Sequence, residues 1–231
     1  MHETKAKINR RIMETTKKVT LDGSSECIQY LSTVDKRLAK AISMVGPITY
    51  QPHEDSYSFL VHEIIEQMLS TKVSKKMFER LTILCNGDVT PIAVSLLTDD
   101  QIRGIGISQS KVSYIRNLTY AITKGELLLD ALGDLPDKTI MDLLCSIRGI
   151  GSWTAKMYLI FVLDRQDVLP FEDFAFLQGY KWLYKTEDIS RKSVEKRCRK
   201  WKPYSSIAAR YMYKALDLGF TKNEFHLYKD A

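Results

Sequence analysis

The chain has 231 residues, 45% of them hydrophobic and 27% charged, enough to bury a core in one domain or in two joined lobes. Lys and Arg outnumber Asp and Glu by 34 to 28, so the net charge of +6 permits a polyanionic partner without establishing one. The longest apolar run, residues 157–163, is too short to cross a bilayer, and no apolar core follows the basic residues 1–12, which excludes a secretory signal.

Helical periodicity dominates the chain, and only residues 17–23 favour a strand. Apolar residues at helical spacing predict helices at residues 26–47, 56–70, 72–85, 109–125, 138–149, 172–185, 190–201 and 203–219. We expect Thr90, Ser108 and Asp137 to be N-caps, with Pro91 at the first position of its helix. The sequence therefore predicts an all-α protein of about ten helices joined by short loops.

The cysteines are widely separated and form no Cys-x-x-Cys pair. They are Cys27, Cys85, Cys145 and Cys198. This spacing argues against a zinc site and against a four-cysteine iron–sulfur cluster, and it fits a reducing, cytoplasmic setting. We therefore expect no metal and no cofactor.

One five-residue motif, Ile-Arg-Gly-Ile-Gly, occurs twice, beginning at Ile102 and at Ile147. Each copy is followed by a short polar joint and an amphipathic helix. The two copies are either one helix–turn–helix packing unit used twice, or phosphate-binding hairpins. We favour the second copy for function because of the residues that follow it.

The second copy predicts a helix, a tight turn and another helix over residues 139–162. Gly149 and Gly151 can adopt positive φ and expose backbone amides with no Cβ in the way. The following helix should begin near Ser152, so its free N–H groups point into the same turn and suit a phosphate oxygen. We expect Lys156, one helical turn further on, to reach a neighbouring phosphate.

The stretch LLCSIRGIGSWTAKM, residues 143–157, resembles the hairpin of the helix-hairpin-helix DNA glycosylase superfamily, in its 3-methyladenine DNA glycosylase II branch, where the motif is Gly-Ile-Gly-x-Trp-Thr-Ala. The resemblance spans residues 30–218 and implies the short form of that fold. It implies a lobe of residues 1–53 with 166–231, a middle lobe of residues 54–165 carrying the hairpin, and an active site in the cleft between them. It also implies that Thr154 contacts DNA.

An acidic pair follows a proline in DRQDVLPFEDFAF, residues 164–176. Position alone does not choose between Glu172 and Asp173, because either suits a helix N-cap or first turn. The resemblance places the catalytic aspartate at Asp173. Such a carboxylate stabilises the oxocarbenium-like sugar cation as the base departs and orients the attacking water. A positively charged alkylated purine leaves without a general acid.

Relatives with strand-nicking activity carry a lysine where this chain has Trp153, which therefore predicts a glycosylase without lyase activity. The segment EIIEQMLSTK, residues 63–72, resembles the family's Gly-Gln-Gln-Leu-Ser wedge, with Glu66 in place of the glycine. By that match Gln67 and Met68 enter the duplex, Met68 as the intercalating side chain. Burial of Met68 in a helical core is equally compatible with the pattern.

The expected base pocket is aromatic, because a cationic base gains from electron-rich rings. Trp153 is the first candidate. The C-terminal segment WKPYSSIAARYMY resembles the family's Trp-x-Pro-Trp-Arg-Ser block, with Ser205 at the arginine position. The match places Tyr213 in the pocket and assigns Trp201 to the fold, although packing of the terminal helix explains both equally well.

The pattern as a whole predicts a monofunctional DNA glycosylase that excises alkylated purines of the 3-methyladenine and 7-methylguanine type in base excision repair. Its partner would be double-stranded DNA with a damaged base. We expect the protein to be a monomer that does not bind a membrane, and to lie in the cytoplasm at the nucleoid or in a nucleus. A monovalent cation at the hairpin is compatible with this. The alternatives are the same fold acting on hypoxanthine, uracil or an oxidised purine, a non-catalytic DNA-binding module, or a helical protein with a chance glycine turn.

Overall fold

The computed structural model describes residues 18–228 and is all-α apart from one small sheet. The sheet pairs β1 (Val19–Leu21) antiparallel with β2 (Ile48–Tyr50). The predicted strand near the N-terminus is confirmed, whereas its partner β2 was not predicted. Within residues 18–228 no helix has the length and apolarity to cross a membrane. The predicted absence of a signal at residues 1–12, and the lobe assignment of residues 1–17 and 229–231, fall outside the described part.

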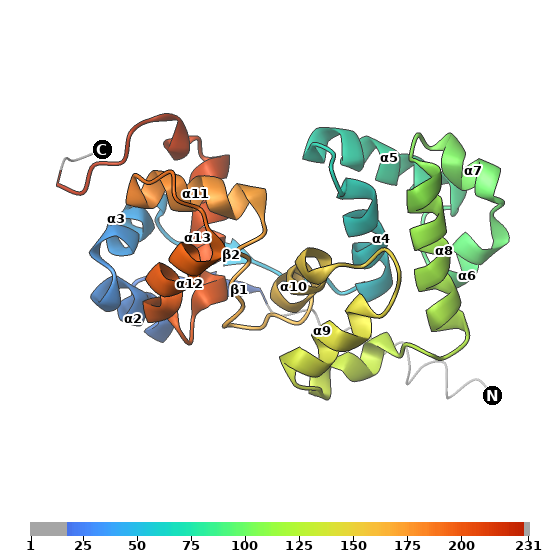
Figure 1. The fold of residues 1–231 in the computed structure, drawn as a ribbon, viewed down its shortest axis with the longest axis horizontal. Helices are drawn as coiled ribbons and strands as arrows, with labels where there is room; N and C mark the ends of the chain where they lie inside the picture. The colour runs from blue at the N-terminus through green and yellow to red at the C-terminus, as the bar shows by residue number, and fades with distance from the viewer. Residues whose placement is uncertain (1–17, 229–231) are drawn as a thin grey trace.

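Two separate hydrophobic clusters form the core, and we name the two groups of helices around them. The hairpin lobe contains α4 (Ser56–Glu66), α5 (Thr71–Leu84), α6 (Pro91–Leu96), α7 (Asp99–Gly104), α8 (Gln109–Thr123), α9 (Asp137–Cys145) and α10 (Ser152–Phe161). The terminal lobe contains the sheet, α2 (Glu26–Val34), α3 (Lys36–Val45), α11 (Phe174–Tyr184), α12 (Arg191–Cys198) and α13 (Ser205–Asp217). Figure 1 shows the two groups side by side, with α10 where they meet. Short 3₁₀ turns lie at Leu129–Asp134, Arg199–Trp201 and Phe220–Lys222.

Local capping sets where the helices begin. The Thr90 and Ser108 hydroxyls each accept a hydrogen bond from the backbone N–H three residues on, as predicted. The prediction that Asp137 is an N-cap is wrong. Pro136 occupies the cap position, so Asp137 is the first residue of α9, and its carboxylate instead forms an ion pair with Arg165 at 3.1 Å.

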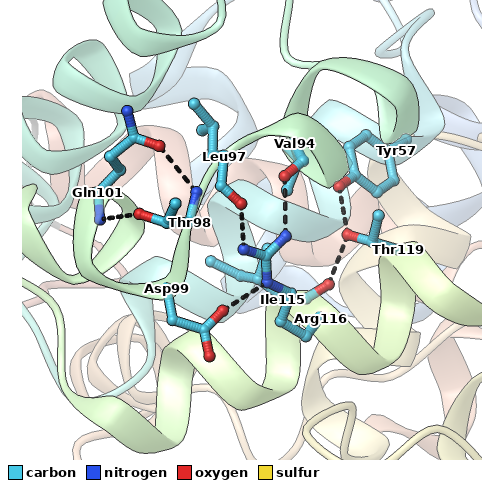
Figure 2. Close-up of polar contacts among 9 residues, drawn as sticks. All are labelled: Tyr57, Val94, Leu97, Thr98, Asp99, Gln101, Ile115, Arg116 and Thr119. Carbon is cyan, nitrogen blue, oxygen red and sulfur yellow. Dashed lines mark hydrogen bonds and ion pairs between the residues drawn. The ribbon is translucent and has the colours of Figure 1, made fainter.

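Arg116, on α8, holds the short helices α6 and α7 in place (Figure 2). Its guanidinium donates to the backbone carbonyl of Val94 at 2.9 Å and to that of Leu97, and it pairs with the Asp99 carboxylate at 2.7 Å. Carbonyl groups at a helix C-terminus lack intrahelical partners, so a side-chain donor can satisfy them. One side chain therefore joins the end of α6 to the start of α7.

The helix predicted at residues 26–47 is divided in two at Asp35, whose carboxylate caps α3 by accepting from the backbone N–H groups of residues 37 and 38. Asp35 is only 3% exposed. Its other oxygen accepts from the Tyr184 hydroxyl and from the Trp201 indole at 3.0 Å, and it pairs with Lys200 at 3.0 Å. Burial alone would raise the pKa of Asp35, but these donors hold the pKa below its usual value.

Replacing this carboxylate by an amide tests its role in the terminal lobe. Asp35→Asn should lower the free energy of unfolding by about 1–3 kcal/mol, because a buried ion pair and charge-assisted hydrogen bonds are lost. The contribution should be fully present above the ordinary aspartate pKa and disappear as the pH falls through the lower folded value. Urea unfolding at pH 7 and at pH 3–4 measures both. The exposed Glu187, paired with Lys181, is the control, and a Glu187→Gln loss as large as that of Asp35→Asn would contradict the assignment.

Candidate active site and nucleic-acid interface

Asp173 lies where the two lobes meet, as the N-cap of α11. One carboxylate oxygen accepts from the backbone N–H of Phe176 at 2.7 Å, and the other accepts from the indole N–H of Trp153, on α10, at 2.8 Å. Asp173 is 8% exposed, and within residues 18–228 no cationic side chain forms an ion pair with it. The structure therefore brings together the predicted catalytic carboxylate and the predicted pocket tryptophan, and supplies the carboxylate with two donors.

Glu172, the neighbouring acid, points to a different set of partners. It accepts from the Ser152 hydroxyl at 2.8 Å and forms an ion pair with Lys156. The Lys156 ammonium also lies 3.5 Å from the centre of the Phe171 ring. Burial lowers the pKa of Lys156, and pairing with Glu172 opposes that effect. The expectation that Lys156 reaches a phosphate stays a prediction; in this structure its ammonium is held by a carboxylate and an aromatic face.

The turn between α9 and α10 has one glycine with positive φ. Gly149 has φ +111°, and a Cβ built there would lie 2.3 Å from Tyr114, so this position excludes any side chain. Gly151 is the N-cap of α10 with φ −99°, so the prediction of a positive φ there is wrong, although nothing lies within 4 Å of a Cβ at this position. Among the described residues, the backbone N–H groups of residues 151–153 donate to no protein acceptor. These amides, at a helix N-terminus, suit an anion.

The two Ile-Arg-Gly-Ile-Gly copies do not form the same turn. In the second copy α10 begins directly after the second glycine, Gly151, whereas in the first copy α8 begins three residues after Gly106. The positive φ falls on Gly106 in the first copy and on Gly149 in the second. The Arg80 guanidinium on α5 donates to the Ile105 carbonyl at 3.0 Å, so the first turn packs against the protein itself.

The predicted wedge loop is attached to the hairpin. The Gln67 side-chain amide donates to the Gly149 carbonyl at 2.9 Å and to the Thr154 hydroxyl at 3.4 Å. Lys111, on α8, donates to the Gln67 carbonyl at 2.7 Å. Thr154 is 1% exposed, and its expected contact with DNA stays a prediction.

Met68 follows Gln67 and is the most exposed large apolar side chain among the described residues, at 102%. Its φ of +59° is unusual for a residue with a long side chain. The interpretation of Met68 as helix core is wrong, because α4 ends at Glu66 and the side chain contacts no core. Glu66, at the family's glycine position, accepts from the Thr71 hydroxyl at 2.8 Å.

One aromatic side chain of the terminal lobe, Tyr213, lies beside Asp173. Tyr213, on α13, lies with its ring centre 5.9 Å from that of Phe161. Its buried hydroxyl forms no hydrogen bond of normal geometry, and burial, together with the adjacent Asp173 carboxylate, raises the pKa of Tyr213 well above its ordinary value. Trp201 is fully buried and donates to Asp35, which agrees with its assignment to the fold. Ser205 donates to Asp167 at 2.5 Å, where the family has an arginine.

A cavity of about 380 Å³ opens beside this group, on the hairpin-lobe side. Its lining consists of His53, Asp55, Ser58, Phe59, His62, Glu63, Phe78 and Phe161. Asp173, Trp153 and Tyr213 do not line it, although Phe161 joins it to Tyr213. A larger hollow of about 680 Å³ is lined by residues 54–57, 91, 122 and 127–131, and contains neither Asp173 nor Glu63. The smaller cavity has the size and the aromatic lining of a ligand site.

Glu63 is a buried acid of this cavity, and the sequence pattern did not single it out. It is 8% exposed, and burial raises the pKa of its carboxyl group, with the charges of Glu66 and Asp173 acting in the same direction. The nearest ring nitrogen of His62 is 3.5 Å from one carboxylate oxygen. The only sequence signal was an acid on the otherwise apolar face of α4, beside Leu60 and Ile64.

Comparison with known proteins gives the class. Residues 61–203 match the model of the HhH-GPD superfamily of base excision DNA repair proteins, so the chain belongs to that family. It is 28% identical over 203 residues to DNA-3-methyladenine glycosylase 1 of Schizosaccharomyces pombe, covering 84% of this chain and 88% of that one.

Two solved structures are similar over most of the chain. A DNA-3-methyladenine glycosidase from Bacillus halodurans has a TM-score of 0.79 and 29% identity, covering 90% of this chain and 97% of the other. S. pombe 3-methyladenine DNA glycosylase Mag1, in complex with abasic DNA, has a TM-score of 0.76 and 26% identity, covering 89% of this chain and all of the other. The recognised branch and the all-α fold class are therefore confirmed.

A monovalent cation at the hairpin stays a prediction. The backbone carbonyls of Arg148 and Gly149 in this turn accept from the side-chain amides of Asn117, at 3.0 Å, and Gln67, at 2.9 Å.

The two glycines of the hairpin give a matched test. Gly149→Ala should lower the thermal stability and weaken binding to a duplex with an abasic site, because the new methyl group collides with Tyr114 and the positive φ costs about 1–2 kcal/mol. Gly151→Ala should change stability by less than about 1 kcal/mol, because its φ is ordinary and the space is open. Thermal unfolding and fluorescence anisotropy measure the two effects. Equal stability loss in both variants would contradict this geometry.

Proposed function

We propose that the protein is a monofunctional DNA glycosylase that excises alkylated purines, of the 3-methyladenine and 7-methylguanine type, from double-stranded DNA. The observation that carries the proposal is the Asp173 carboxylate, held between the N-terminus of α11 and the Trp153 indole, with free hairpin amides and a cavity nearby. Relatives named as DNA-3-methyladenine glycosylases support the substrate class. The protein acts as a monomer at the nucleoid or in the nucleus.

Asp173 acts on the sugar. As the bond from C1′ to the purine breaks, its electron pair passes to the departing base, and a cation develops at the sugar ring. A fixed carboxylate with its lone pairs directed at that cation stabilises the transition state. Water then bonds to C1′ and gives up a proton, leaving an abasic sugar. An alkylated purine begins with a positive charge and leaves as a neutral molecule, so it requires no proton.

The hairpin and the wedge present the nucleotide to Asp173. Free amides at residues 151–153 hold a phosphate oxygen of the strand. Met68, fully exposed on a loop held by Lys111 and Gln67, fills the gap in the base stack after the nucleotide is extruded. Extrusion costs a few kcal/mol, and it is least costly for a damaged base.

The role of Asp173 is tested with its neighbour as the control. Asp173→Asn should release free methylated base from methylated duplex at least about a hundredfold more slowly than wild type, because the amide carries no charge to stabilise the cation. Asparagine is also a good N-cap, so the fold should persist. Glu172→Gln should remain within about tenfold of wild type, because Glu172 is engaged with Lys156 rather than with the sugar. Similar losses in the two variants, or none in Asp173→Asn, would refute the assignment. If wild type binds duplex DNA tightly and in a salt-dependent way but releases no base, the protein is a non-catalytic DNA-binding module instead.

The absence of strand cleavage follows from Trp153, because an indole forms no Schiff base with the abasic sugar. Lys156 lies nearby but is held by Glu172. Borohydride added to wild type with an abasic duplex should therefore trap no covalent adduct, and the strand should break only after alkali. An adduct that disappears in Lys156→Arg would show instead that this lysine is a nucleophile.

A further inference from the structure

The cavity that Phe161 joins to Tyr213 contains a buried carboxyl group for which the mechanism above has no use. Glu63 lines the cavity and is 8% exposed. Its side chain has one hydrogen-bond partner among the described residues, His62, at the long distance of 3.5 Å. Buried carboxyl groups normally have several partners, and an isolated one is costly. An apolar side chain would suit this face of α4 better if packing were the only requirement.

Glu63 and Asp173 are within electrostatic reach of each other. The Asp173 charge acts on the carboxyl group of Glu63, and both acids act on Tyr213. The two carboxyls differ in their surroundings. Asp173 accepts from two N–H donors, which suits an ionised carboxylate, since such a group only accepts. Glu63 is buried in the cavity wall, where its one partner among residues 18–228 is the His62 ring nitrogen at the long distance of 3.5 Å. Burial and the charge of Glu66 raise the pKa of Glu63 against the opposing effect of His62, which suits the neutral acid, since it has a proton to donate.

We propose that Glu63 is a second catalytic residue of this site, a general acid that protonates a ring nitrogen of the flipped purine as the base departs. The proposal rests on the proposed function, and it extends the substrate class from cationic alkylated purines to neutral damaged purines. Phe59 and Phe161 stack on the base in the cavity, and Glu63 faces its edge. A pair of carboxyls with opposite protonation is the arrangement by which glycosidases cleave neutral leaving groups.

The step balances in protons and electrons. The bond between C1′ and N9 breaks, and its electron pair passes to the purine. The Glu63 proton moves to N7 or N3, so the base leaves as a neutral molecule rather than an anion. Water bonds to C1′ and gives its proton to Asp173, which returns it to solvent, and Glu63 regains a proton from water. A 7-methylguanine base already carries the compensating charge and does not use the Glu63 proton.

The test compares a neutral and a cationic base in the same variant. Single-turnover release is measured from duplexes with one hypoxanthine, which is neutral, or one 7-methylguanine, which is cationic. Wild type should release both. Glu63→Gln should lose about a hundredfold or more on hypoxanthine, the usual contribution of a general acid, and less than about fivefold on 7-methylguanine. Release of 7-methylguanine also shows that this variant is folded.

Glu79→Gln, which changes an exposed acid of α5 outside the cavity lining, is the control and should stay within about threefold of wild type on both bases. Equal losses on both bases in Glu63→Gln, or unchanged hypoxanthine release, would overturn the role of Glu63. So would a wild type that releases 7-methylguanine but not hypoxanthine. Release of neither base by wild type would overturn the proposed function itself, and the role of Glu63 with it. Asp173→Asn should lose both bases, which separates the two carboxyls.

Discussion

The hydrogen bond from the Trp153 indole to the Asp173 carboxylate is the contact on which the arrangement of the site depends. Trp153 belongs to α10, the second helix of the hairpin, and Asp173 begins α11 in the terminal lobe. An indole N–H can only donate a hydrogen bond, so the partly buried Trp153 needs an acceptor, which Asp173 at the start of α11 provides. The orientation of one lobe to the other therefore fixes the oxygens of Asp173, the proposed catalytic residue, relative to the turn proposed to bind a phosphate. Arg210 reinforces the junction by donating from α13 to the Ile160 carbonyl at 2.7 Å.

The wedge loop is ordered by the protein before any DNA is present. The Gln67 amide and the Lys111 ammonium fasten its backbone to the hairpin and to α8, while Met68 stays in solvent with a positive φ. A strained and exposed apolar residue costs free energy in the free protein. Because the loop already holds this conformation, binding requires a smaller loss of conformational entropy. The hydrogen bond from the Gln67 amide to the Gly149 carbonyl holds the loop and the hairpin together. In the proposed function the two would therefore contact DNA as one unit.

Local sequence rules located most helices, and their failures have physical causes. Asp35 lies inside an unbroken apolar period, so only its buried partners, which are distant in sequence, show that it ends one helix and caps the next. The repeated Ile-Arg-Gly-Ile-Gly motif left open whether its two copies form the same turn. The residues after each copy decide where the next helix begins, so the positive φ lies at the second glycine in the first copy and at the first glycine in the second. Asp173 was found through resemblance, whereas Glu63 was not, because its significance arises only where residues from three parts of the chain enclose one cavity.

The charges around the site explain how an acidic centre coexists with a polyanionic ligand. Glu172 is neutralised by Lys156, and Glu66 is held by Thr71 beside His62, so neither presents a free charge to the backbone of DNA. The groups that remain for a phosphate at the hairpin are backbone amides, which attract an anion without a mobile side chain. Asp173, which forms no ion pair with a cationic side chain of residues 18–228, and Glu63, whose one partner is His62 at 3.5 Å, are each only 8% exposed. In the proposed complex, repulsion from the duplex is thereby kept small, while the Asp173 carboxylate acts on a sugar cation in a site shielded from water and Glu63 acts on the base.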